Sequence, residues 1–416
     1  MDAANPISVD ETSIRYEGWR IVAVCFVVAT FGWAFGFYGQ GVYLAELHRL
    51  HGWPASLISA TTTFFYLFGA VLVMFVAETI RKFGPRNCLV AGITATALAA
   101  IAIGQVQSIW QLYLANILLA IGWAGTSLAM ISTTLGLWFN QKRWMAISLA
   151  LNGASFGGVA GVPLLVFAIG QWGFSNAMIV AATTMVVLVI PVVLVFVGSP
   201  PLKSGSAVAA AGDVASSAQI RARALRDVGF LSVSIAFALV LFAQVGFVVH
   251  LISFLDPVIG RPNAAVAIAL LTAMAVVGRV LFSTVIDRLN QRLASALSFA
   301  SQAVALLIVI NFRNDALLIA ACAMFGFSVG NLITLPSLIV QREFDPRSFG
   351  VLISLLTAIT QITYAFGPGV IGALRDFSGS YTLPFYGCIV LELMAAMLVL
   401  LRSKSASTRP TDAVSA

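Results

Sequence analysis

The chain alternates between long apolar runs and short polar turns along nearly its whole length. Twelve runs are long enough for a helix that crosses a bilayer, which takes about 20 apolar residues. We expect these helices at 19–44, 57–80, 87–106, 109–135, 144–171, 176–197, 227–254, 263–286, 293–312, 315–339, 347–374 and 381–402. The pattern therefore predicts an all-α integral membrane protein with twelve transmembrane helices.

One turn is much longer than the others and divides the runs six plus six. Residues 198–226 are rich in Ser, Ala and Gly and begin with Pro200 and Pro201, as a linker does. We therefore expect two six-helix pseudo-repeats. The predicted domains are an N-terminal bundle at 1–197, a cytoplasmic linker at 198–226, a C-terminal bundle at 227–402 and a cytoplasmic tail at 403–416.

Composition supports a membrane protein and excludes several classes of function. The 416 residues are 60% hydrophobic and only 9% charged, whereas soluble domains carry about a quarter charged residues. A soluble enzyme, a nucleic-acid binder and a secreted module are therefore excluded. The four cysteines show no disulfide or metal spacing, and the three histidines form no catalytic constellation with the scattered acids. We expect no enzyme activity, no metal and no cofactor.

The basic residues predict the orientation in the membrane. The net charge is +7, and in a membrane protein Lys and Arg gather in the cytoplasmic turns. With the N-terminus inside, only Arg49, Arg261, Arg313 and Arg375 fall in outer turns, and every other basic residue except Arg279 falls in a cytoplasmic segment. We therefore expect both termini in the cytoplasm and no nucleic-acid partner.

The two halves share a charged turn. "IRKFGPR" (80–86) closes the second run and "IDRLNQR" (286–292) closes the eighth, with matching positions for the isoleucine, the charges and the final arginine. Arg143 and Arg347 likewise precede a glycine-rich helix in each half. Parallel repeats of this kind place a substrate site near the bilayer midplane, between the halves.

This arrangement resembles the major facilitator superfamily of transporters. The family's turn motif is Gly-x-x-x-Asp-Arg-x-Gly-Arg-like. In the first copy here Ala77 and Arg81 replace the glycine and the aspartate, with Glu78 as the candidate acid, whereas the second copy keeps Asp287 and Arg288. The resemblance implies a cytoplasmic gating motif that consists of Arg81, Gly84, Arg86, Asp287 and Arg288.

Three further stretches resemble the oxalate/formate antiporter and monocarboxylate porter branch of that family. They are "LHGWPASLIS", "LWFNQKRWMAISLALNGASFGG" and "VVGRVLFSTVIDR". In that branch the arginine eight residues before the aspartate of span eight binds the substrate carboxylate, and this position is Arg279. The branch's other charged partners are absent: the mammalian carriers' aspartate position is Ala275, span one has no lysine, and the oxalate antiporter's lysine position is Thr360, beside Gln361.

Arg279 also stands out by its depth in the membrane. Eight residues separate it from Asp287, about 12 Å along a helix, which places it near the middle of a core about 30 Å thick. A charge there costs at least ~2.5 kcal/mol, and the residues one turn away, Ala275 and Ser283, are not acids. A guanidinium pairs two-point with a carboxylate. We expect Arg279 to bind a substrate with one negative charge; a buried ion pair is the alternative.

Other polar residues within the runs are candidates for the same cavity or for ordinary hydrogen bonding between helices. They are Tyr38, Gln40, Tyr66, Asn152, Gln244, Asn331, Gln361 and Tyr364. Two ionisable residues are candidates for proton coupling. His250 is equally consistent with a packed interface, and Glu392, in the last run, is more consistent with an interhelical or lipid-edge role.

Together these features predict a secondary active transporter of a small organic anion, a monocarboxylate, that works by alternating access with the carboxylate at Arg279. We expect a monomer in the lipid bilayer of the plasma membrane, the inner membrane of a bacterium, with a proton or an exchanged anion as the coupled species. An exporter of drugs or hydrophobic metabolites would share the fold without needing Arg279. A membrane-embedded sensor is the alternative from another class.

Overall fold

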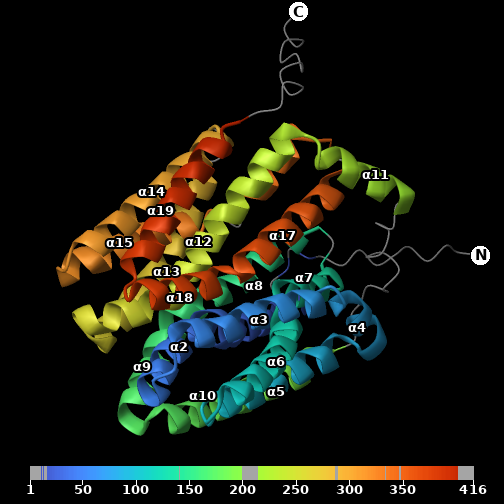
Figure 1. Ribbon diagram of the computed structural model, residues 1–416. Coiled ribbons are helices and arrows are strands. Elements are labelled where there is room, and N and C mark those ends of the chain that lie inside the picture. Colours follow the sequence, from blue (N-terminus) through green and yellow to red (C-terminus); the bar gives the residue numbers. More distant parts are fainter. Residues whose placement is uncertain are drawn as a thin grey trace, which may run out of the picture. The chain divides into compact units, whose positions relative to one another are not determined.

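Every regular element that the structure describes is a helix (Figure 1). The structure, a computed structural model, describes residues 11, 13, 16–139, 141–198, 214–285, 289–332, 334–345 and 348–401. Ten helical segments are long and apolar enough to cross a membrane, and Asp315–Val329 and Thr382–Leu398 are shorter apolar helices. Together these account for the twelve runs predicted from the sequence.

The first half of the chain is built from helices that follow one another with short turns. Two π-helical turns, η1 and η2, interrupt the α-helices. In chain order the elements are α1 (Gly18–Trp33), η1 (Ala34–Tyr38), α2 (Gly39–His51), α3 (Ala55–Val73), α4 (Val76–Phe83), α5 (Pro85–Ile103), α6 (Ile109–Thr126), α7 (Leu128–Gly136), α8 (Arg143–Phe156), η2 (Gly157–Gly161), α9 (Val162–Trp172) and α10 (Phe174–Phe196).

The second half follows the same pattern. Its first helix, α11, lies within the stretch predicted as a linker. The elements are α11 (Val214–Ala224), α12 (Val228–Ile259), α13 (Arg261–Val285), α14 (Gln291–Asn311), α15 (Asp315–Val329), α16 (Leu335–Glu343), α17 (Phe349–Ala365), α18 (Gly367–Ser378) and α19 (Thr382–Leu398).

Several predicted spans are not continuous helices. The run at 109–135 ends one helix at Thr126 and starts another at Leu128, because the Ser127 side chain accepts a hydrogen bond from Met130 N and caps the new helix. The run at 315–339 breaks between α15 and α16, where Pro336 in the first turn of α16 has no N–H to donate. The run at 347–374 breaks at Phe366, just before Gly367 and Pro368.

The chain packs as two compact units. The first comprises Met1–Gly39 and Phe68–Ala210, and the second comprises Gln40–Leu67 and Ala211–Ala416. The hairpin formed by α2 and the beginning of α3 therefore packs with residues from the second half of the sequence. The division predicted from the sequence, with its boundary at 198–226, stays a prediction.

In the first unit, backbones approach closely where glycines face a neighbouring helix. A Cβ atom on Gly153 or Gly157 of α8 and η2 would overlap the carbonyl oxygens of Phe26 and Thr30 on α1. Helices that pack without side chains between them are typical of membrane proteins, in which small residues supply the contact surface. The glycine spacing in the sequence is thus explained by close packing of α1 and α8.

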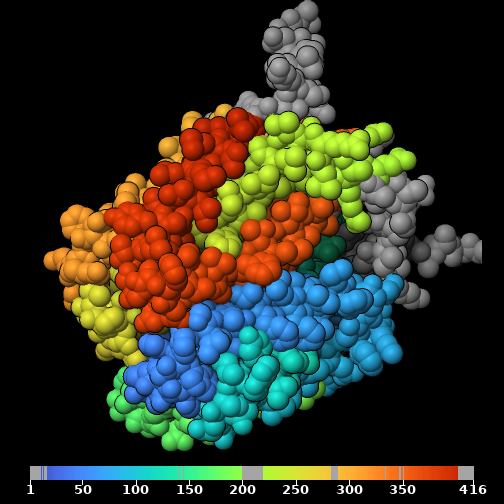
Figure 2. Space-filling view, in the orientation of Figure 1, coloured from blue at the N-terminus to red at the C-terminus, as the bar shows by residue number. Residues whose placement is uncertain are grey.

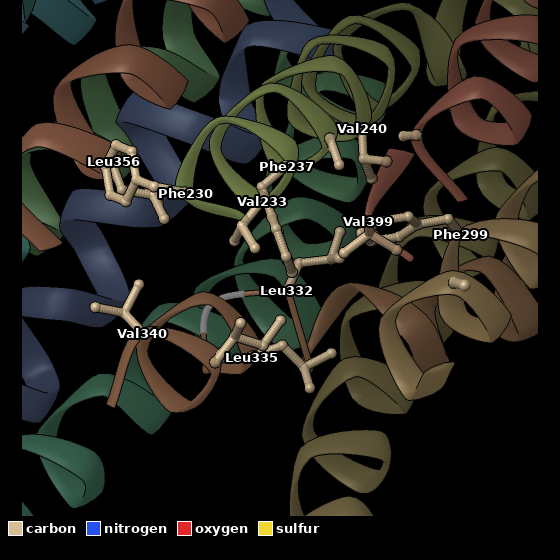
Figure 3. Close-up of a cluster of buried hydrophobic side chains, with 14 of the residues drawn as sticks. Phe230, Val233, Phe237, Val240, Phe299, Leu332, Leu335, Val340, Leu356 and Val399 are labelled. Atoms are coloured by element: carbon tan, nitrogen blue, oxygen red, sulfur yellow. The ribbon is translucent and has the colours of Figure 1, made fainter. Parts of the chain in front are cut away.

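In the second unit, α12 is flanked by α17, α18 and α19, while α13 packs on α15, and α14 packs on both α15 and α19. Side chains of α19 pack against those of α12 on the face shown in Figure 2. A cluster of buried apolar side chains fills the interior (Figure 3). It includes Phe230, Val233, Phe237, Val240, Phe299, Leu332, Leu335, Val340, Leu356 and Val399.

Candidate functional site

Arg279 lies on α13 and is partly buried, and its guanidinium is bonded to the end of another helix. Its Nε donates to the carbonyl oxygen of Gly330 at 3.3 Å. Gly330 is the residue that caps the C-terminus of α15. The last carbonyls of a helix have no partner within it and carry a partial negative charge. The broken end of α15 thus contributes to the stability of a permanent cation within an apolar helix.

Three glycines allow α13 and α15 to approach at this point. A Cβ atom on Gly330 would overlap the carbonyl oxygen of Ala275, and one on Gly278 would overlap that of Phe327. Gly326, one turn before Gly330, lies equally close to the carbonyl oxygen of Leu271. The position of Arg279 relative to the α15 terminus is therefore fixed by backbone-to-backbone packing.

The break between α15 and α16 presents a buried amide beside Gly330. Asn331 is 2% exposed, and its Nδ2 donates weakly to the Phe327 carbonyl oxygen at 3.4 Å, whereas its Oδ1 has no partner among the described residues. Leu332, within the break, and Leu335, the first residue of α16, belong to the apolar cluster. Asn331 also lines a cavity of about 260 Å³ between α13, α14 and α15. The Arg279 guanidinium, the C-terminal carbonyl of α15 and the Asn331 amide oxygen therefore all lie at or beside this break.

The structure brings some of the other predicted residues together within the second unit. Thr62 Oγ1 donates to Gln40 Oε1 at 2.9 Å, and the rings of Tyr66 and Tyr364 meet edge to face with centroids 5.7 Å apart. Gln40 and Tyr66 are buried. These pairs belong to α2, α3 and α17, whereas Arg279 and its Gly330 partner belong to α13 and the end of α15.

The remaining candidates are single side chains on separate helices. Gln244 is buried on α12, with its Oε1 unpaired among the described residues, and Gln361 is partly buried on α17. Tyr38, at the end of η1, and Asn152, on α8, belong to the first unit. Their roles in substrate binding remain predictions.

His250 is buried within α12, and both of its ring nitrogens are bonded. Nε2 lies 3.0 Å from the carbonyl oxygen of Pro368, and Nδ1 lies 3.1 Å from Tyr381 Oη. Because a carbonyl only accepts, Nε2 donates to Pro368. Both ring nitrogens are thus engaged within a packed interface, the arrangement expected for the packing role that the sequence context left open.

The first copy of the predicted gating motif lies at the surface. Arg81 and Glu78 form a half-exposed ion pair at 3.9 Å, and Gly84 adopts a left-handed φ of 80° that lets α5 start at Pro85. Arg86 is exposed. In the second copy, Asp287 and Arg288 lie outside the described residues.

The last arginine of the second motif, Arg292, is a functional candidate that the sequence analysis treated only as a turn charge. It is 1% exposed. Its Nε and Nη2 bond both carboxylate oxygens of Glu343, at 2.7 and 2.6 Å, and Nη1 donates to Ser232 Oγ and to the Val399 carbonyl. This fork ties α14 to α12, α16 and α19. The matching arginine spacing of the two motifs was the only signal that could have indicated it.

A second missed cluster joins the α2 hairpin to α12 and α13. Glu46 is 1% exposed and forms ion pairs with Arg49, at 2.8 Å, and with Arg261. Arg261 also bonds Asp256 at 2.7 Å. These residues line or adjoin a cavity of about 510 Å³. The sequence indicates only that Arg49 and Arg261 lie in outer turns, and nothing in it indicates a buried network.

Comparison with known proteins places these features in a family. The chain matches the sequence profile of the Major Facilitator Superfamily over residues 23–356 and 264–415. It is 26% identical to the MFS-type transporter pynF of Aspergillus niger over 386 residues, 90% of this chain and 84% of the relative. It is 25% identical to monocarboxylate transporter 13 of Bos taurus over 308 residues, 73% of this chain and 70% of the relative.

A solved structure shares the fold. A bacterial homologue of the human lysosomal transporter Spinster, in an inward-facing and unoccupied conformation, superposes with a TM-score of 0.73. The match covers 93% of this chain and 97% of that one, at 15% sequence identity. The predicted fold class, a twelve-helix membrane protein of the major facilitator type, is confirmed.

Proposed function

The chain belongs to the Major Facilitator Superfamily, whose members are membrane transporters and not enzymes, and we propose that its cargo is a small organic anion with one carboxylate bound at Arg279. That the chain is a multi-pass membrane protein with a small-molecule substrate follows from the family. The monocarboxylate is our inference, supported by Arg279 and by the similarity to monocarboxylate transporter 13.

One observation supports the cargo assignment most strongly. Arg279 is a permanent cation in an apolar helix, and its Nε is bonded to the main-chain carbonyl of Gly330. A carboxylate forms shorter and stronger charge-assisted bonds to a guanidinium than a carbonyl does. A cargo carboxylate would therefore compete well for Arg279 and accept two parallel hydrogen bonds.

The cargo charge also gives the transport cycle a physical basis. Closing a site around a charged group is costly because the charge loses its water. A bound carboxylate neutralises Arg279 and lowers this cost, so the loaded transporter changes conformation more readily than the empty one. Alternating access would then proceed by rocking of the two repeats around the site, with a proton or a second anion as the coupled species.

The experiment is uptake of labelled acids into proteoliposomes by the wild type and by Arg279→Ala and Arg279→Lys. Loss of a buried charge-assisted pair costs about 2–5 kcal/mol, so Arg279→Ala should weaken the apparent affinity for a monocarboxylate by roughly 30-fold or more. Arg279→Lys keeps the charge without the fork and should be intermediate. Equal uptake of every acid by the wild type and Arg279→Ala would refute the assignment.

The same assay tests the predicted charge of the cargo. With one fixed cation, we expect lactate-like acids to be preferred over oxalate or succinate. A strong preference for the dicarboxylates would overturn the monocarboxylate inference while leaving an anion transporter. Export of uncharged hydrophobic compounds, unaffected by Arg279→Ala, would instead support the exporter alternative.

We also propose that the chain is a monomer in the plasma membrane, a bacterial inner membrane, with both termini in the cytoplasm, as the distribution of Lys and Arg favours. Labelling of single cysteines with an impermeant reagent in a cysteine-free background tests the orientation. A cysteine in the outer turn at Arg313 should react from outside intact cells, and one at Arg86 should react only after lysis. The opposite result would reverse the topology.

A further inference from the structure

The interior between α12, α14 and α19 holds two polar side chains that the proposed substrate site does not use. Glu392 on α19 and Gln302 on α14 are both 0% exposed. Neither carboxylate oxygen of Glu392 and neither amide atom of Gln302 has a hydrogen-bond partner among the described residues. Buried polar atoms are nearly always paired, so four unpaired atoms within one bundle interior require an explanation.

The register of the two helices places these side chains at the same level. The helices α14 and α19 lie side by side (Figure 1) and run antiparallel. They are joined near one end by Tyr386 Oη and Asn311 Oδ1, 3.3 Å apart, and near the other by Arg292 Nη1 and the Val399 carbonyl oxygen, 2.7 Å apart. Gln302 is midway between the two contact points on α14, and Glu392 is midway between those on α19.

The surroundings of Glu392 do not favour an ionised carboxylate. Phe299, three residues from Gln302 on α14, and Ala395, three residues from Glu392 on α19, both belong to the buried apolar cluster, part of which is drawn in Figure 3. An ionised carboxylate that is sealed from water without a cation carries a desolvation cost that a neutral acid avoids.

The titratable groups on the three helices are already engaged or uncharged. On α14, Arg292 is held by Glu343. On α12, His250 is bonded through both nitrogens and Asp256 is paired with Arg261. On α19, the Tyr386 hydroxyl donates to Asn311. On α19 itself, Cys388 is a buried thiol one turn from Glu392. None of these groups supplies a positive charge to the acid.

We propose that Glu392 binds a proton at neutral pH and pairs, as a neutral carboxylic acid, with Gln302. The acid O–H donates to the amide oxygen of Gln302, and the amide N–H donates to the carboxyl C=O of Glu392. Two hydrogen bonds of this kind satisfy all four atoms. The ligand of this site is a proton that stays bound throughout transport and fastens α19 to α14.

This inference is independent of the cargo at Arg279 and removes Glu392 from proton coupling. It therefore selects the interhelical role over the coupling role that the sequence left open. The same atoms would be present in a transporter of any substrate, so the cargo need not be known for the pair to be tested.

The direct test is infrared difference spectroscopy of the purified full chain, wild type against Glu392→Gln. Other carboxyls in water are ionised from about pH 5 to about pH 9, so a neutral C=O stretch that persists over this range identifies a sealed acid. We expect such a band in the wild type, its absence in Glu392→Gln, and its shift to higher frequency in Gln302→Leu, which removes the partner. A difference spectrum without the band, a band that titrates within this range, or a band that Gln302→Leu leaves in place would overturn the proposal.

A variant in which the acid and the amide exchange positions is the control for substitutions that prevent folding. The double substitution Glu392→Gln with Gln302→Glu moves the acid to α14 and the amide to α19 while keeping both hydrogen bonds. It should recover the pH-independent band and at least half of the wild-type thermal stability lost in Gln302→Leu. A reversed pair no more stable than Gln302→Leu would show that the two side chains do not meet.

Transport measurements separate a retained proton from a coupled one. Because Glu392→Gln keeps an amide pair in place of the acid–amide pair, uptake should show the same pH profile as the wild type, within about twofold at each pH. A flattened pH profile in Glu392→Gln would assign the proton to coupling and refute a permanently bound one.

Discussion

The buried ion network around Glu46 makes a strong and asymmetric prediction. Glu46 is 1% exposed, whereas its partners Arg49 and Arg261 have side chains 52% and 21% exposed. Replacing Arg261 with Gln leaves a buried carboxylate with one half-exposed arginine. Removing one partner of a buried pair costs about 3–5 kcal/mol because the other charge stays buried and unpaired. Arg261→Gln should therefore be severely destabilising.

The opposite substitution should be much milder. Glu46→Gln removes the buried charge itself, and Arg261 keeps Asp256, to which Nε and Nη2 donate at 3.0 and 2.7 Å. The loss of unfolding free energy should then be only about 1 kcal/mol, the value of a typical hydrogen bond. The double variant should be close to Glu46→Gln alone, which gives a coupling energy of about 3–5 kcal/mol in magnitude.

The assay is denaturant- or heat-induced unfolding of the purified chain in detergent, followed by circular dichroism, for the wild type, both single variants and the double variant. Arg49→Gln is the matched control, because it removes an exposed partner of the same carboxylate and should cost less than ~1 kcal/mol. If Glu46→Gln proved more harmful than Arg261→Gln, or if Arg49→Gln equalled Arg261→Gln, the reasoning from burial would be wrong.

Three further substitutions test other parts of the second unit. Gly330→Ala should displace α13 from α15 and lower uptake at least tenfold, because the new Cβ would overlap the Ala275 carbonyl oxygen. The control Gly387→Ala on α19, with no atom within 4 Å of the added Cβ, should leave uptake unchanged, and equal rates for the two variants would contradict this. Arg292→Lys should lower the unfolding midpoint, since an ammonium cannot bond both oxygens of Glu343, at a cost of about 1.5–3 kcal/mol for the lost charged hydrogen bonds; an unchanged midpoint would show that the fork is not needed. His250→Gln should keep the pH dependence of uptake, because both ring nitrogens of His250 are engaged in hydrogen bonds within a packed interface, and a pH profile that flattened in this variant would restore the proton-coupling role.

The fold could be predicted from the sequence because apolar length is a one-dimensional property. A run of about 20 apolar residues specifies a spanning helix whatever its neighbours are, so the twelve runs followed directly. The helix breaks were less accessible. Gly330 and Pro336 mark the interruption of α15–α16, yet the apolar run continues through them, and hydropathy does not register a missing N–H.

The bond between Arg279 and Gly330 could not have been predicted from side chains. Its acceptor is a main-chain carbonyl that lies 51 residues further along the chain, and every residue has such a carbonyl. Similarly, hydropathy marks Arg292 and Glu46 only as charges next to turns, and does not indicate that either is buried. Their burial depends on which acid or base another helix presents, and that is decided only by tertiary packing.

The membership of Gln40–Leu67 in the second unit has a consequence for biogenesis. This hairpin leaves the ribosome long before α12, α13 and α18, against which it finally packs. Until Arg261 is synthesised, Glu46 lacks one of its two arginines. Gly41, which lies against the carbonyl oxygens of Val248 and Val249 in the finished protein, likewise has no counterpart until α12 is made. The first two spans must therefore wait in the membrane, with lipid or the insertion machinery covering them. The hairpin at Gln40–Leu67 can therefore complete its packing only after the C-terminal half has been synthesised. A truncated chain that ends before α12 would leave this hairpin without a surface to pack against.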